Sequence, residues 1–181
     1  MTDTFTPLRA IALSLALALP LPAMAQQAVD TAPIATAIDT FETAFTGGDM
    51  EGVFAVMPPA ILGFIARQAG VSDAELRAQM ASATEAAMAS VEIEEFGMDL
   101  DAATTGRSPE GRAYALVPTT ATMSVPQQGR FRSVNTTLAL EDDGEWYLMR
   151  IDDPNQIAIL RQVYPDMAGV DFPQGTLEQL K

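Results

Sequence analysis

Apolar residues first recur at helical spacing, three or four positions apart. The first such stripe consists of Ile34, Ile38, Phe41 and Phe45. It predicts one helix with a buried side, opened by Pro33 and ended by the Gly47-Gly48 pair.

Three more helices are predicted before residue 91. Asp49 is expected to cap a short helix that Pro58-Pro59 stops, and residues 60–68 form the next one. Ser72 and Glu75 form a capping box, which predicts a long Ala-rich helix to about residue 90. The buried side of this helix is predicted to carry Leu76, Met80, Ala83, Ala87 and Val91.

From residue 91 the hydrophobic period changes to alternation, which is typical of strands. Four strands are predicted, at residues 91–100, 112–123, 131–140 and 146–151. The joints between them are rich in turn formers, and Asp143-Gly144 is a strong hairpin signal because both residues accept positive φ. Several short joints favour an antiparallel order.

The C-terminal part is predicted to contain one helix and a tail. Asp152-Asp153-Pro154 should start the helix and Pro165 should end it. Residues 166–181 are predicted to be an irregular tail, with a short end helix at 176–180.

These elements predict a single α+β domain over residues 33–165. N-terminal helices pack on a curved, mainly antiparallel sheet of four or more strands, cone-like in shape, and a C-terminal helix follows. Because the first helix must pack on the concave sheet, a shared core of four residues is expected: Phe41, Phe45, Trp146 and Leu148.

Residues 1–25 have the three-part pattern of a secretory signal peptide. Arg9 precedes an apolar run at 10–19, and Ala23 and Ala25 supply the small residues of a cleavage site near Ala25. The run is shorter than the ~20 residues that cross a bilayer. We therefore expect a soluble periplasmic or secreted protein without a membrane span, with a disordered leader at 26–32.

The formal net charge is −14, from 24 acidic and 10 basic residues. Such a charge repels phosphates, so nucleic acid is not expected as a partner. The sequence contains no His and no Cys, which removes the usual general base, the thiol nucleophiles and most transition-metal ligands. Neither a metal nor a cofactor is expected.

Two segments carry a family resemblance. Residues 41–53, with an aromatic start and a Gly48-Asp49 turn before a short helix, are similar to the first-helix signature of the nuclear transport factor 2-like superfamily. The strand at 145–151, which follows an acidic-Gly hairpin and contains Trp146, resembles the closing strand of that family. The extra helical pieces at 58–90 and the helix after the last strand depart from its pattern. The resemblance implies a cone-like sheet and leaves function open, because the family hosts isomerases, dehydratases, binding modules and dimer scaffolds.

Five residues are candidates for a pocket. Asp99 is a possible base and Tyr114 and Tyr147 are possible hydrogen-bond donors, as the family's pocket chemistry implies. Arg132 and Arg150 could bind a ligand carboxylate. The alternatives are a strand-end turn for Asp99, core packing for the tyrosines, and surface ion pairs for the arginines.

The sequence favours a non-catalytic role. The expected function is an exported soluble binding or interaction module, with a small molecule, held in an apolar pocket, or a protein as its partner. One alternative is a carboxylate- and Tyr-based enzyme of the isomerase or dehydratase type. The other is a homodimeric scaffold, against which the Thr-rich strands argue, because Thr hydroxyls are hard to bury in a tight dimer core.

Overall fold

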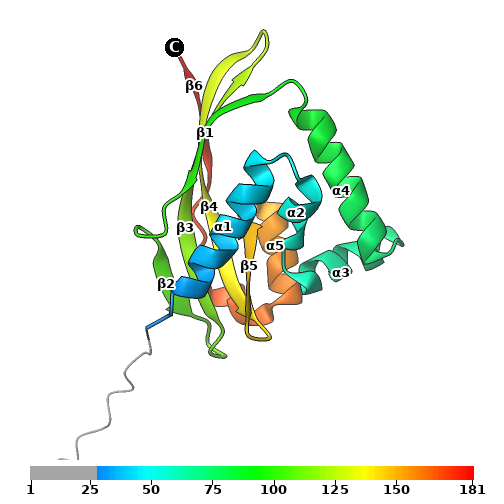
Figure 1. Cartoon of the computed structure of the whole chain (residues 1–181). Coiled ribbons are helices and arrows are strands. Elements are labelled where there is room, and N and C mark those ends of the chain that lie inside the picture. Colours follow the sequence, from blue (N-terminus) through cyan, green and yellow to red (C-terminus); the bar gives the residue numbers. More distant parts are fainter. Residues whose placement is uncertain (1–27) are drawn as a thin grey trace, which may run out of the picture.

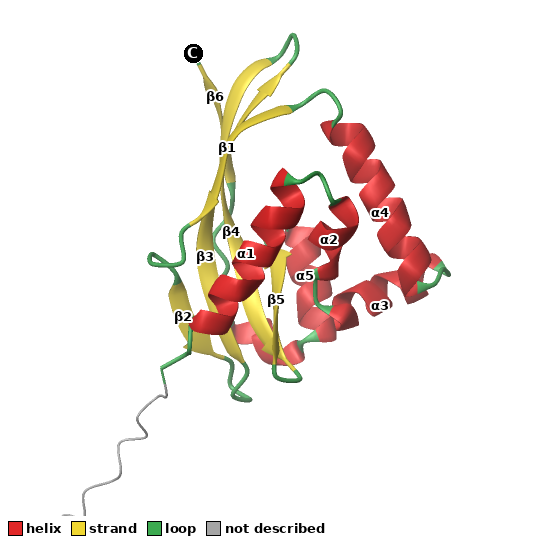
Figure 2. Ribbon diagram, viewed as in Figure 1, coloured by secondary structure: helices red, strands yellow, loops and turns green. Residues whose placement is uncertain are grey.

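The computed structural model describes residues 28–181, so the predicted signal peptide and its cleavage site lie outside the described residues. Helices come first and a strongly curled antiparallel sheet follows, with a helix near the C-terminal end (Figure 1). The predicted α+β class is therefore confirmed, and Figure 2 shows the sheet curling into a half-barrel around the first helix.

Four helices precede the sheet, and local signals explain their ends. They are α1 (Ala32–Thr46), α2 (Met50–Ala55), α3 (Pro59–Ala69) and α4 (Asp73–Met88). Asp49 accepts a hydrogen bond from the Gly52 amide at 2.9 Å, as predicted for a cap. The capping box of Ser72 and Glu75 is also confirmed, and the backbone amide of Ser72 lowers the pKa of the Glu75 carboxyl.

Six strands form one sheet. They are β1 (Glu92–Met98), β2 (Thr104–Arg107), β3 (Ala113–Val125), β4 (Gly129–Asp142), β5 (Glu145–Arg150) and β6 (Thr176–Leu180). The long hairpin of β3 and β4 forms its centre. Asp143 and Gly144 have φ values of 52° and 84°, so the predicted tight turn between β4 and β5 is confirmed.

Each central strand has two partners along its outer side. β3 pairs with β2 along residues 113–116 and with β1 along 119–124. β4 pairs with β5 along 137–142 and with β6 along 130–134. The sheet thus has a proximal half, flanked by β2 and β5, and a distal half, flanked by β1 and β6, which is uppermost in Figure 1.

Helices cover both faces of the proximal half. α1 covers one face, here called the α1 face, where Ile34 and Ile38 pack on the sheet residues Ala115, Val117, Ala139 and Leu148. On the other face, here called the α5 face, Leu138, Leu140 and Met149 pack against α5 (Pro154–Val163) and the 3-10 turn η1 (Pro165–Gly169). The protein therefore has two main cores, one on each side of the sheet.

The expected shared core is only partly present. Phe41, Trp146 and Leu148 belong to the cluster under α1. Phe45 lies outside that cluster and is half-buried, because it is on the last turn of α1, where the helix passes the edge of the core.

Two predictions about individual elements are wrong. The end of the tail is a strand and not a helix, because β6 satisfies its backbone groups by pairing with β4. On α4 the predicted inward residues Ala83 and Ala87 are exposed, and the less exposed stripe is Leu76, Met80, Ala81, Thr84 and Met88. In the described part of the chain, no helix is long and apolar enough to cross a membrane.

Candidate functional site

The distal half of the sheet has an apolar α1 face without a core cluster. Directly paired residues of neighbouring strands share a face, and faces alternate along each strand. In β1 a bulge between Ile93 and Glu95 interrupts this alternation and brings Ile93 and Phe96 to the same face. The register therefore places on one surface Ile93 and Phe96 of β1, Met123 of β3, Phe131 of β4 and Leu177 of β6. The first four are half-buried and Leu177 is 66% exposed.

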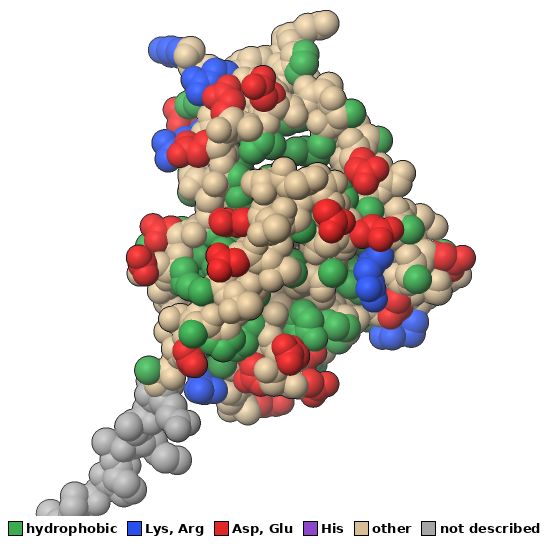
Figure 3. Space-filling model, viewed as in Figure 1, with side chains coloured by type: hydrophobic (Ala, Val, Ile, Leu, Met, Phe, Trp, Pro, Cys, Tyr) green, Lys and Arg blue, Asp and Glu red, His purple; other side chains and the backbone are tan. Residues whose placement is uncertain are grey.

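Figure 3 shows the molecule hollowed at this place, between the distal half of the sheet, the end of α1 and the second half of α4. Hydrophobic side chains are visible inside the opening. We call this space the distal hollow and define its sheet wall by the five residues above. In the proximal half, by contrast, α1 packs directly on this face of the sheet.

Three aromatic rings, two from α1 and one from the sheet wall of the distal hollow, pack against one another. The ring of Phe45 lies 5.7 Å from that of Phe41 and 4.9 Å from that of Phe96, centroid to centroid. Phe41 and Phe96 are also 5.7 Å apart. These distances are typical of favourable ring contacts, so α1 and β1 hold the three rings in place while each ring stays half-buried.

The second half of α4 passes over the distal hollow. The first half of this helix packs on α2 and α3, where Leu76 joins Leu62 and Ala66 in a small cluster. Thr84 and Met88 continue the same helical stripe beyond that cluster and are half-buried. Met88 is the last residue of α4, the helix that passes over the distal hollow.

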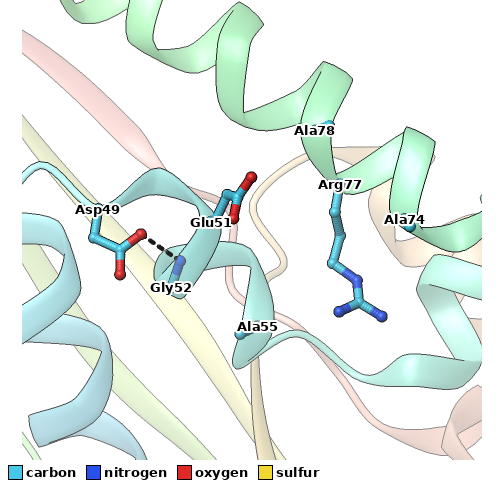
Figure 4. A pocket seen from close by; sticks show the side chains of 7 residues that line it. All are labelled: Asp49, Glu51, Gly52, Ala55, Ala74, Arg77 and Ala78. Carbon is cyan, nitrogen blue, oxygen red and sulfur yellow. Dashed lines mark hydrogen bonds between the residues drawn. The ribbon is translucent and has the colours of Figure 1, made fainter.

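A second cleft, of about 440 Å³, lies between α2 and α4 (Figure 4). Its wall is made of small residues with three charged ones: Asp49, Glu51, Gly52, Ala55, Ala74, Arg77 and Ala78. Asp49 is used as the cap of α2. The adjoining Gly52 is required, because a Cβ there would lie 2.5 Å from the Asp49 carboxylate. The cleft is shallow and exposed, and helix packing explains its shape.

A third cleft, of about 400 Å³, is bordered by acidic residues around Arg112. Arg112 Nε donates to Asp166 at 3.0 Å, and its Nη1 donates to Asp142 at 2.9 Å. Its guanidinium also lies 4.6 Å from the centre of the Tyr164 ring. Burial lowers the pKa of Arg112, but the two carboxylates outweigh this effect and hold it above the ordinary value.

The Arg112 cluster connects the last part of the chain to the sheet. The buried Asp166 also accepts from Ser108 Oγ at 2.7 Å, and Tyr164 donates to Asp142 at 2.9 Å. Burial and the neighbouring Asp142 raise the pKa of Tyr164 well above its ordinary value. Asp142 and Asp166 are therefore both paired with Arg112 and hydrogen-bonded to a hydroxyl group. Such fully paired carboxylates indicate a structural role, which is to hold η1 against the sheet.

The predicted base Asp99 is exposed in the turn after β1. Its Oδ1 accepts a hydrogen bond from the Ala102 amide at 3.0 Å, and its own amide donates to the Pro118 carbonyl. The turn alternative considered for this residue accounts for these contacts.

The two predicted tyrosines share a face of the sheet. Tyr114 and Tyr147 both pair with Leu140, from opposite sides, and so lie in one row on the α5 face. Both are half-buried, and Tyr114 closely covers Gly106, where a Cβ would lie 2.6 Å from the ring. Tyr114 packs against the core under α5.

The two predicted arginines lie apart from the tyrosines and from each other. Arg132 is exposed on the α5 face of the distal half, paired with Thr122 and Glu178. Arg150 is exposed on the α1 face of the proximal half, and its Nε donates to Asp152 at 2.7 Å. Of the five candidate residues, only the two tyrosines share one face in the same half of the sheet, and Arg132 lies on that face in the other half.

Sequence reasoning missed both the distal hollow and the Arg112 cluster. The available signal for the distal hollow was the alternation in β4, which places Phe131 on one face and Arg130 and Arg132 on the other. In β1 the alternation gave no such signal, because a bulge between Ile93 and Glu95 is needed to bring Ile93 and Phe96 to one face. For the Arg112 cluster, the only signal was weak: one Arg directly before a strand in an acidic chain.

Comparison with protein-family models, curated proteins and solved structures finds no match for this chain. Within residues 28–181, His, Cys, Asp and Glu side chains form no group of three or more that could hold a metal ion. The functional argument therefore depends on the geometry of the described residues.

Proposed function

We propose that this protein is an exported, non-catalytic binding module that holds a small apolar molecule in the distal hollow. The observation that carries the proposal is the sheet wall of the distal hollow, whose five apolar residues belong to none of the core clusters and face an open space beneath α4. Apolar surface left in water is unfavourable, and a contiguous patch of this kind is typical of binding sites.

The arrangement of the rings supports a preformed site. Phe41 and Phe45 are held by α1 and Phe96 by β1, and each leaves part of its surface open. A ligand that covers these surfaces gains ~25 cal/mol for each Å² of apolar area that it removes from water. Because the walls already have this shape, little ordering of the protein would oppose binding.

The enzyme alternative lacks support from geometry. Tyr114 and Tyr147 lie on the α5 face, and Asp99 is engaged in an exposed turn. In the homodimer alternative a second copy would have to cover the α1 face of the distal half, across which the second half of α4 lies.

Two tryptophan substitutions on neighbouring residues of β3 test the proposal. Ala121 is half-buried on the α1 face of the distal half, paired with Phe96 and Ser133. Ala121→Trp should fill the distal hollow and weaken binding of the uncharged fluorophore N-phenyl-1-naphthylamine by at least about tenfold. Thr120→Trp places the same side chain on the opposite face and should leave binding unchanged.

Fluorescence titration of the purified mature protein measures both affinities. Far-UV circular dichroism and thermal unfolding confirm that both variants are folded. Equal loss of affinity in the two variants, or no binding by the wild-type protein, would contradict the proposal.

A further inference from the structure

Charged residues are segregated between the two faces of the distal half. The positions on the α1 face of these strands are occupied by apolar, hydroxyl or amide side chains. The polar ones are the uncharged Thr119, Ser133, Asn135 and Gln179. The sheet wall of the distal hollow therefore bears no charge.

The charges of the same strands lie on the opposite face. Arg130 forms an ion pair with Glu94, which lowers the pKa of that carboxyl to about 2. Arg132 is paired across the sheet with Glu178. Because alternation turns these side chains away, neither arginine can reach a ligand on the α1 face.

The helical segments next to the distal hollow, α1 and the second half of α4, contain acidic residues and no Lys or Arg. Residues 28–66, which include α1 and α2, contain no Lys or Arg. The only basic residue of α4 is Arg77, which borders the cleft with α2 at the other end of the helix. Two acids lie beside the lining residues: the half-buried Glu42 follows Phe41, and the exposed Glu85 is one helical turn before Met88.

We propose that the distal hollow selects apolar ligands that carry no negative charge. This inference rests on the proposed function and names the ligand class of the same site. A carboxylate in the hollow would lose its hydration without gaining a cation or an Arg fork. The net charge of −14 would also oppose its approach.

A matched pair of ligands tests the charge preference. Monododecanoylglycerol and dodecanoate share one acyl chain, and only dodecanoate is charged at about pH 8. Both are used below their micelle concentrations to displace N-phenyl-1-naphthylamine from the wild-type protein. The neutral ester should compete at a concentration at least about tenfold lower than dodecanoate, because the carboxylate is penalised by burial.

The outcomes separate this inference from the proposed function. If the fluorophore binds and dodecanoate competes as well as the ester, the charge preference is overturned while the binding site stands. If neither the fluorophore nor the ester binds, the proposed function fails and the charge preference fails with it.

A pair of lysine substitutions on β6 tests the electrostatic cause. Gln179 is exposed on the α1 face, and Thr176 is exposed on the α5 face of the same strand. Gln179→Lys should strengthen dodecanoate binding about two- to fivefold and leave the ester unchanged, as expected for one exposed ion pair. Thr176→Lys makes the same change of net charge and should alter neither; an equal gain in both variants would show that net charge alone governs selection.

Discussion

At the residue scale, Arg112 makes the most concentrated set of polar contacts in the described chain. It links Asp142 at the end of β4 with the buried Asp166 of η1, and its guanidinium lies against the ring of Tyr164. In this cluster, side-chain hydrogen bonds between charged or hydroxyl groups join residues 22 to 58 positions apart in sequence, beyond the reach of local patterns. Caps show the opposite case: Asp49 and Ser72 act within three residues of themselves, and the sequence predicted both.

Arg112→Met should lower the free energy of unfolding by about 2–3 kcal/mol, because it leaves the buried Asp166 carboxylate without its cation. Denaturant unfolding at neutral pH measures the loss. Arg107→Met is the matched control, since the exposed Arg107 donates only to the Gly111 carbonyl. A similar small loss in both variants would mean that the Arg112 cluster contributes little.

Tyr164 predicts an alkaline limit to stability. Its folded pKa is raised above the ordinary value of 10.0 by burial and by Asp142. Above about pH 10 the unfolded chain can release this proton while the folded chain cannot, so unfolding becomes more favourable as the pH rises. Wild-type protein should therefore lose more stability between about pH 9 and pH 11 than Tyr164→Phe, as measured by urea unfolding. Parallel pH curves would contradict the assignment.

At the element scale, sequence patterns failed to predict which side of α4 is buried and that residues 176–180 form a strand. In an Ala-rich helix several stripes satisfy the same spacing, so Ala83 and Ala87 were placed inward although they are exposed. The end of the tail, Thr-Leu-Glu-Gln-Leu, contains good helix formers. It is nevertheless a strand, because pairing with β4 decides its conformation.

Gly175 leads the chain into β6 and allows a close approach. A Cβ at this position would lie 2.3 Å from the terminal amide of Asn135 and 2.9 Å from the Cβ of Asp152. Gly175→Ala should therefore loosen β6 and speed hydrogen exchange of its amides by about tenfold or more. Gly169→Ala is the control, because a Cβ there would meet nothing within 4 Å. Equal protection of β6 in both variants would contradict this explanation.

At the scale of the whole molecule, the order of elements and the alternation of the strands were enough to predict the α+β class and the curled sheet. The candidate pocket could not be predicted in the same way. Tyr114, Tyr147, Arg132 and Arg150 were chosen by chemistry, while their faces depend on the register of β4 with β3, β5 and β6. The resemblance to the nuclear transport factor 2-like superfamily stays a prediction.

The register of the strands also divides the sheet into two halves that differ in how they are covered. Both faces of the proximal half are covered by helices and form the two main cores. The α1 face of the distal half is left open beneath α4, as Figure 3 shows. The proximal half is thus held by two packed cores, while the distal half keeps part of its apolar surface open. The proposed binding site requires this arrangement.

Methionine methyl NMR tests the central claim most directly, because methionines lie both in the distal hollow and in the cores. Met123 lies on the sheet wall of the distal hollow, and the half-buried Met88 ends the helix that passes over it, whereas Met149 and Met167 are buried in the core under α5. With ¹³C-methyl-labelled protein, titration of monododecanoylglycerol should shift the Met88 and Met123 signals and leave those of Met149 and Met167 in place. Shifts confined to Met149 and Met167, or no shift at any methionine, would contradict binding in the distal hollow.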